Sequence, residues 1–327
     1  MSNVARTLVY AALAAVLSQT IGQAHAQAQW PTKPVKLIVS QGAGGAPDIV
    51  ARLVSDRLSR IWGQQVLVEN RPGSGNIIGA QLAAHAAPDG YTLFFATAAA
   101  LVTNPYTFKT LPYDPARDFV PVGMVGKAPF LVLVHPSVKA NTLAELIALE
   151  KSQPGKLTFA TDGPRNFSGM VAAWLNKLGG VNILQVPYAT MPQGIQDTIA
   201  GRTQLVILAI PVAAAQIKRG ALRPLAFTAP TRAPGFEDVP PVAQTFPGFN
   251  FVGWFAVCTP SGTPQDVIVR INHDLDTVLK DREVVQRLRD MGIFTDGADT
   301  PEGTAAFVRA ELVSWGKVVH DIGLQPE

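Results

Sequence analysis

Short runs of β-branched and aromatic residues alternate with amphipathic patterns along the chain from residue 35 onward. The run 35–39 predicts a strand, and the apolar residues Ile49, Leu53 and Ile61 after it recur at the spacing of one helix face. The alternation also predicts a strand at 65–69, a helix at 77–86 and a strand at 91–96. This β-α-β-α-β order favours parallel sheets covered by helices, which is the α/β class.

The same alternation returns after Pro136. Thr142 and Glu145 have the spacing of a capping box and predict the start of a helix. Strands are then expected at 157–160, 182–186, 205–208 and 222–227, and helices at 168–178, 193–200 and 212–218. Thr263-Pro264 and Thr300-Pro301 predict the starts of two final helices. The segments 122–134 and 249–258 are extended and apolar.

The first 26 residues have the features of a secretory signal peptide. Arg6 precedes an apolar run at 8–17, and Ala24-His25-Ala26 offers small residues around a cleavage point. The run is too short to span a bilayer permanently. We therefore expect export and cleavage near Ala26.

The distribution of charged residues and the number of cysteines each bear on what the protein can bind and how it is held together. The net charge of the chain is +3, and the basic residues are dispersed among acidic ones, so we expect no nucleic-acid partner. Cys258 is the only cysteine, which precludes an internal disulfide, and its apolar surroundings predict a packed thiol. About 300 mature residues are enough for two lobes that each have a core.

The loop after the first strand is a candidate anion site. Ligands of open α/β sheets bind beyond the carboxyl ends of the strands, and helix N-termini present amides to anions. Ala43, Gly44, Gly45 and Ala46 lie between the strand and its helix. The alternative is a tight turn without a ligand. Asp48 either caps the helix or accepts a hydrogen bond from a ligand amine or a water.

Three further segments that follow strands supply polar groups for the same cleft. The candidate ligand-binding residues in them are Thr97, Ala98, Thr161, Arg165, Asn166, Ser168, Tyr188 and Thr190. Ser168 has an alternative role as a helix N-cap, and Tyr188 as a packed aromatic residue.

The sequence contains neither of two common catalytic motifs that would support an enzyme. G-x-S-x-G and H-E-x-x-H are absent, and His85, His135, His273 and His320 lie far apart in the sequence. The glycines of 42–47 and 73–79 do not have the dinucleotide-binding spacing, which argues against NAD. We expect no cofactor and no metal. A triad assembled from distant residues would make the protein a secreted hydrolase, which stays as an alternative. An orphan sensing receptor is another.

Several motifs in order along the chain resemble the Bug-type receptors of tripartite tricarboxylate transporters. They are GGAPDIVAR at 44–52, VENRPGSG at 68–75, PDGYTL at 88–93, DFVPV at 118–122, VPY at 186–188 and TPSGTP at 259–264, with Trp30-Pro31 before and Trp315 after them. The resemblance covers nearly the whole mature chain.

The resemblance implies a type II periplasmic-binding-protein fold, in which two α/β lobes enclose a ligand cleft. It places lobe one at 27–127 and 249–327 and lobe two at 128–248, with crossings near Lys127 and Phe249. It also implies a small-molecule carboxylate ligand, a periplasmic location, a monomer, and membrane permease subunits as partners.

The chain departs from this family at Pro164-Arg165-Asn166-Phe167, where relatives have a glycine- and serine-rich turn that leads to a histidine. A guanidinium at this position would bind a second carboxylate in two-pronged fashion, and Phe167 would line the pocket against an aromatic ring. The alternative is that Arg165 points to solvent and Phe167 packs under its helix.

Overall fold

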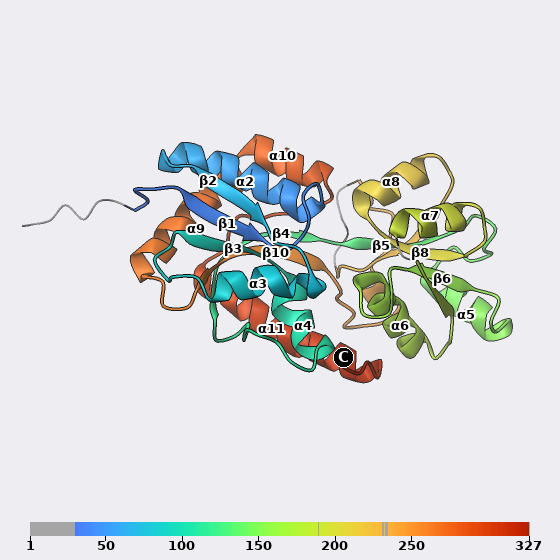
Figure 1. The fold of residues 1–327 in the computed structure, drawn as a ribbon. Coiled ribbons are helices and arrows are strands. Elements are labelled where there is room, and N and C mark those ends of the chain that lie inside the picture. The colour runs from blue at the N-terminus through green and yellow to red at the C-terminus, as the bar shows by residue number, and fades with distance from the viewer. Residues whose placement is uncertain (1–29, 189, 231, 233–234, 327) are drawn as a thin grey trace, which may run out of the picture.

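The computed structural model describes residues 30–326 except 189, 231 and 233–234, so the expected signal peptide lies outside the described residues. Figure 1 shows two α/β lobes side by side, each built on one five-stranded sheet. The first sheet has the order β2 (Val66–Asn70), β1 (Val35–Val39), β3 (Thr92–Thr97), β10 (Gly253–Pro260) and β4 (Phe119–Ala128). The second has the order β7 (Leu184–Pro187), β6 (Thr158–Thr161), β8 (Leu205–Ala209), β5 (Phe130–Val134) and β9 (Arg223–Phe227).

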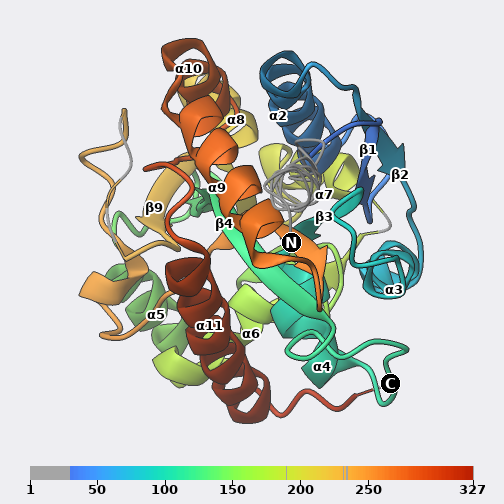
Figure 2. The same cartoon turned by 90° about the vertical axis from the view of Figure 1, so that its left-hand side faces the viewer.

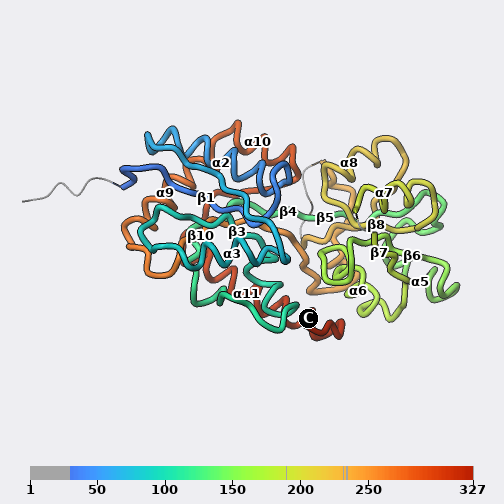
Figure 3. The backbone as a smooth tube through the Cα atoms, viewed as in Figure 1, coloured from blue at the N-terminus to red at the C-terminus, as the bar shows by residue number. Residues whose placement is uncertain are grey.

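The predicted strands are present, but the sheets are mixed, whereas the sequence had favoured parallel ones. β1 pairs in parallel with β2 and β3, whereas β10 runs antiparallel to β3 and β4. Likewise β5 is antiparallel to β8 and β9. The cause is the crossing of the chain between lobes (Figure 3), because β5 and β10 each enter a sheet from the side at which its parallel strands end.

Helices cover both faces of each sheet. In lobe one, α2 (Ala46–Trp62), α9 (Gln265–Lys280) and α10 (Arg282–Asp290) share one core cluster with the sheet. On the other face lie α3 (Ile77–Ala84), α4 (Asn104–Thr107) and α11 (Pro301–Asp321), as Figure 2 shows. In lobe two, α5 (Leu143–Ser152) and α6 (Phe167–Gly179) lie opposite α7 (Met191–Ile199) and α8 (Ile210–Lys218).

Side chains cap the first turns of α5 and α10. The Thr142 hydroxyl accepts a hydrogen bond from the Glu145 amide at 3.1 Å, which confirms the predicted cap. Helix α10 was not predicted, because its nine residues are mostly charged. It begins where the Asp281 carboxylate accepts from the amides of Glu283 and Val284, both at 3.0 Å.

A cluster of aromatic side chains joins the lobes. This aromatic hinge cluster comprises Phe130 of β5, Phe167 and Trp174 of α6, Phe249 and Phe251 of the returning segment, and Trp315 of α11. Ring centroids lie 4.0 Å apart for Phe130 and Phe167, and 4.1 Å apart for Phe251 and Trp315. One continuous hydrophobic core therefore runs through both lobes.

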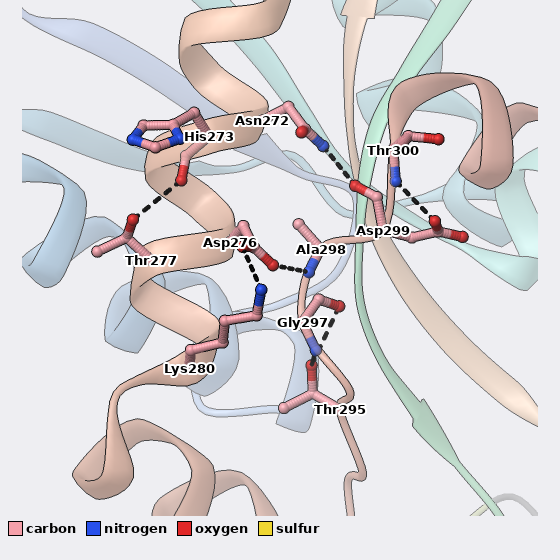
Figure 4. A network of polar contacts seen from close by, with 10 residues as sticks. All are labelled: Asn272, His273, Asp276, Thr277, Lys280, Thr295, Gly297, Ala298, Asp299 and Thr300. Carbon is pink, nitrogen blue, oxygen red and sulfur yellow. Dashed lines mark hydrogen bonds and ion pairs between the residues drawn. The ribbon is translucent and has the colours of Figure 1, made fainter.

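A polar network ties α9 to the segment 295–300 that leads into α11 (Figure 4). The Asp276 carboxylate accepts from the Ala298 amide at 3.1 Å, and the Asn272 side-chain amide donates to the Asp299 carbonyl at 2.7 Å. This segment is therefore fixed against lobe one. No helix within the described part of the chain is long and apolar enough to cross a membrane.

Candidate ligand cleft

The carboxyl ends of β1 and β3 in lobe one face lobe two, in which β6 and β7 lie side by side (Figures 1 and 3). The loops that follow these strands carry the predicted site residues. The fold therefore brings the predicted segments to the region between the lobes, where backbone amides and side chains of both lobes are available to a ligand.

The loop after β1 is exposed and is held by Asp48. Ala43, Gly44, Gly45 and Ala46 are all exposed just before or at the start of α2. The Gly44 amide donates to Asp48 Oδ2 at 2.8 Å, although Asp48 itself is only 3% exposed. This contact orients the loop before α2, and the Asp48 carboxylate lies in the first turn at the positive end of the helix dipole.

Arg52 completes this arrangement and was missed from the sequence. Its guanidinium contacts both Asp48 oxygens, at 3.1 and 2.9 Å, and donates to Asn70 at 3.0 Å. Asn70 in turn donates to the Gln41 carbonyl at 3.0 Å. Burial raises the pKa of Asp48, but the hydrogen bonds from Arg52 and the Gly44 amide outweigh it and the pKa is lowered. The four-residue spacing of Asp48 and Arg52 was the available signal.

The end of β3 passes directly into a wide helical turn. Thr97 and Ala98 are buried, and the π-helical segment η2 (Ala99–Thr103) follows. Asn104, at the start of α4, donates to the Gly75 carbonyl at 2.8 Å. Segments of π-helix are frequent at functional sites, so this turn is a second candidate element of the site in lobe one.

The turn after β2 is strained beside the cleft. Ser74 has φ of 46° and Asn76 has φ of 78°, which are uncommon values for residues other than glycine. The Asn76 side-chain oxygen accepts a hydrogen bond from the Ser40 hydroxyl at 3.2 Å. Such strain persists only where the surroundings impose it, and it clusters at ligand sites.

In lobe two, the end of β6 forms a closed polar turn. Ser168 is buried and exchanges hydrogen bonds with Asp162, and the Asp162 amide lies 2.9 Å from its hydroxyl. The alternative role of Ser168 as N-cap is wrong, because Asn166 is the N-cap of α6. Thr161 is fully buried, and its hydroxyl has no hydrogen-bond partner among the residues that the structure describes.

Tyr188 and Thr190 lie at the end of β7. The Tyr188 hydroxyl donates to Asp197 at 2.8 Å, and burial followed by this carboxylate raises the pKa of Tyr188. Its hydroxyl is thus satisfied within lobe two, as the alternative role of a packed aromatic residue requires. Thr190 is exposed at the start of α7 and makes no side-chain cap.

Arg165 and Phe167 both line the cleft, as the first of the two descriptions expected, and neither lies as the alternative described it. Arg165 is half-buried and donates to the Gln325 carbonyl at 3.0 Å, so it reaches from lobe two to the C-terminal segment of lobe one. Phe167 packs against Phe130, at 4.0 Å, and against Phe251 instead of merely lying under its own helix. The carbonyl partner of Arg165 is too far along the chain for a local pattern to indicate it.

A cleft of about 300 Å³ opens between the lobes at this place. Ala98, Arg165 and Asn166 are the predicted site residues that line it. The other lining residues are Gly75, Asn76, Ala99, Thr103, Asn104, Thr107, Phe108, Phe167, Met170 and Trp315. The remaining predicted residues lie outside this lining, namely Ala43, Gly44, Gly45, Ala46, Asp48, Thr97, Thr161, Ser168, Tyr188 and Thr190.

The lining therefore combines three kinds of surface. Thr103, Asn104 and Thr107 supply hydroxyl and amide groups, Arg165 supplies a positive charge, and Phe108 with Trp315 supplies apolar rings. Among the described residues that line this cleft there is no histidine and no carboxylate. Such a lining suits a small anion with an apolar body.

Other chemistry is not assembled in the described ranges. Within residues 30–326, with the gaps named above, no group of three His, Cys, Asp or Glu residues is placed to hold a metal ion. Cys258 is buried, as predicted, and burial raises the pKa of its thiol.

Sequence comparisons relate the chain to one family over most of its length. Residues 50–324 match the family described as "Tripartite tricarboxylate transporter family receptor". A UPF0065 protein of Bordetella bronchiseptica is 33% identical, covering 100% of this chain and 96% of its own length. Protein BugT of Bordetella pertussis is 32% identical, covering 90% of each chain.

Solved structures have the same two-lobe fold. Rpa4515 of R. palustris, solved with adipate, has a TM-score of 0.78 and 31% identity, covering 91% of this chain and 100% of its own. MatC from Rhodopseudomonas palustris, with bound malate, has a TM-score of 0.73 and 28% identity, covering 89% and 100%. The periplasmic binding protein BugD has a TM-score of 0.73 and 27% identity, covering 91% and 100%. The expected type II fold, with two α/β lobes around a cleft, is confirmed.

Proposed function

Because the chain belongs to the receptor family of tripartite tricarboxylate transporters, we propose that it is a periplasmic receptor for a small organic carboxylate. The observation that carries this proposal is the interlobe cleft, whose lining joins hydroxyls, amides and the Arg165 guanidinium to apolar rings. Adipate in Rpa4515 and malate in MatC support the ligand class. The exposed amides of 43–46 at the start of α2 would approach the carboxylate when the lobes close.

Binding would be coupled to hinge motion. We propose lobe one at 27–127 and 249–327 and lobe two at 128–248, so that both crossings lie beside the aromatic hinge cluster. Rotation about these crossings would bring the loop after β1 toward Tyr188 and Thr190. The predicted residues that lie outside the cleft lining would then become ligand contacts in the closed state.

The wider biological role extends this proposal. The receptor would act as a monomer, enter the periplasm by means of the signal peptide at 1–26, and deliver its ligand to membrane permease subunits. The alternative is a sensing receptor without a permease. Delivery of bound ligand to reconstituted permease subunits would support the transport receptor over the sensing receptor. A hydrolase would need a nucleophile beside a base, and no histidine is found among the cleft-lining residues that the structure describes.

A thermal-shift screen tests the ligand class. Adipate and malate head the panel of mono- and dicarboxylates, and adipamide serves as a neutral control of similar shape. A carboxylate that binds the native state raises the melting temperature with concentration, whereas the amide does not. The proposal fails if neutral amides stabilise the protein as well as the acids do, or if no carboxylate stabilises it.

Small-angle scattering tests closure directly. The ligand found by the screen should lower the radius of gyration at saturation, because the lobes approach one another. An unchanged scattering profile with a ligand bound would contradict the closing receptor.

A further inference from the structure

A second cavity, of about 440 Å³, lies at the hinge. Both crossing segments and both lobes line it. Phe251 packs into the aromatic hinge cluster, whereas its neighbours Asn250 and Val252 line this cavity. The cavity and the interlobe cleft therefore lie on opposite sides of the returning segment, and we call the cavity the hinge pocket.

The floor of the hinge pocket is apolar and partly aromatic. Ile293, Phe294 and Phe307 of lobe one line it together with Val252. Ala229 of lobe two forms part of the opposite wall. An aromatic or branched body would bury apolar surface here, which is the main source of affinity in small-molecule pockets.

Three cationic residues, Lys127, Arg232 and Arg289, line the hinge pocket. Lys127 and Arg289 both line the pocket, and neither forms a salt bridge with any residue that the structure describes. Arg287, on the same helix as Arg289, is instead paired with Glu283 at 2.7 Å. The Lys127 ammonium lies 4.9 Å from the centre of the Phe307 ring, at the junction of charge and apolar floor.

Acidic groups near the pocket do not cancel this charge. Among the described residues that line the pocket, Asp296 is the one carboxylate, and it is exposed. Glu311 lies close enough to Lys127 to interact with its charge, but the Glu311 carboxylate is buried and accepts from the indoles of Trp254 and Trp315. The lining favours an anion over a cation.

The lobe-one wall of the pocket is preformed. Lys127 and Phe294 exchange two backbone hydrogen bonds of 2.8 Å, which attach the wall to β4. The network in Figure 4 fixes the following residues, since the Thr295 hydroxyl accepts from the Gly297 amide at 3.2 Å and Asp276 holds Ala298. A ligand would not have to order this wall, so little binding energy would be lost.

We propose that the hinge pocket is a second binding site, for a small aromatic monoanion such as a carboxylate or sulfonate. The anionic group would lie between Lys127 and Arg289, and the ring would rest on Phe294 and Phe307. This site is separate from the interlobe cleft, because the two share no lining residue that the structure describes.

Fluorescence titration of the full mature chain with 1-anilinonaphthalene-8-sulfonate tests the proposal, because this anionic aromatic probe brightens in apolar pockets. We expect saturable binding at one site. Arg289→Gln should weaken it roughly 10-fold, as loss of one charge-assisted contact does. Arg287→Gln is the matched control and should leave the affinity unchanged, because Arg287 does not line the pocket.

Two further arms keep the test specific. N-phenyl-1-naphthylamine lacks the sulfonate, and its binding should respond to Phe307→Ala but not to Arg289→Gln. Melting curves of each variant confirm that it is folded. The proposal is overturned if the sulfonate probe does not saturate, if Arg289→Gln and Arg287→Gln have equal effects, or if Thr103→Val in the cleft weakens the probe while Phe307→Ala does not.

Discussion

The loop around Gly44 and the aromatic hinge cluster are held by different forces. The loop is exposed, and its conformation depends on directional hydrogen bonds to the Asp48 carboxylate. Phe251 at the centre of the cluster is only 1% exposed and has ring neighbours on several sides. Because the loop buries little apolar surface, changes there should affect binding more than stability, and changes in the cluster should do the reverse.

The pKa of a buried carboxyl group is also shifted in opposite directions in the two regions. Asp48 has a guanidinium beside it, and its pKa is lowered. Glu311 packs among the rings next to the cluster, where burial raises its pKa although two indoles donate to it. Low solvation is common to both sites, so the difference lies in the directly paired cation.

The largest expected effect is on stability in the cluster. Phe251→Ala should lower the free energy of unfolding by about 3–5 kcal/mol, because it removes a buried ring and leaves a cavity. Urea denaturation of the purified protein measures this change. Val313→Ala is the control, since Val313 is 74% exposed and should change stability by less than about 0.5 kcal/mol. Similar losses for both variants would show that the cluster does not stabilise the fold.

The next effect is on binding at the loop. Asp48→Ala should weaken carboxylate binding roughly 10-fold, because it frees the Gly44 amide and the Arg52 side chain. Asp48→Asn should be milder, since its side-chain oxygen still accepts from Gly44. Calorimetric titration with a carboxylate from the screen decides between them. A larger loss for the Asn variant would show that the negative charge itself meets the ligand.

Glu311→Gln should change the pH dependence of stability. The pKa of Glu311 is raised in the folded state. Its contribution to the free energy of unfolding is therefore fully present below the ordinary pKa of 4.5 and is lost as pH rises through the pKa of the folded state. The variant cannot ionise, so its stability relative to the wild type should increase with pH above 4.5. Denaturation midpoints from pH 4 to 8 measure this difference, and a constant difference would refute it.

The smallest effect is expected at Arg165. We predict that diacids bind more tightly than their half-amides, and that Arg165→Ala reduces this preference about 3-fold, because the half-buried guanidinium already serves Gln325. Competition titrations with both compounds on both proteins measure the preference. Equal affinity of the wild type for diacid and half-amide would exclude a role in recognising a second carboxylate.

The sequence by itself determined most elements and the local caps. Strand β1 follows from a run in which four of five positions are apolar, and Thr142 forms the cap that its spacing to Glu145 indicated. Asp48 likewise holds the loop before its own helix. These features depend on hydrogen bonds and periodicity within a few residues, which a sequence pattern records.

Only the tertiary structure decided the strand directions and the lining of the cleft. The antiparallel placement of β5 and β10 follows from crossings between lobes. Trp315 lines the cleft beside Phe167, and Arg165 meets Gln325 across 160 positions of sequence. Such contacts depend on how the two lobes pack, and no local spacing encodes which distant residues will share a surface.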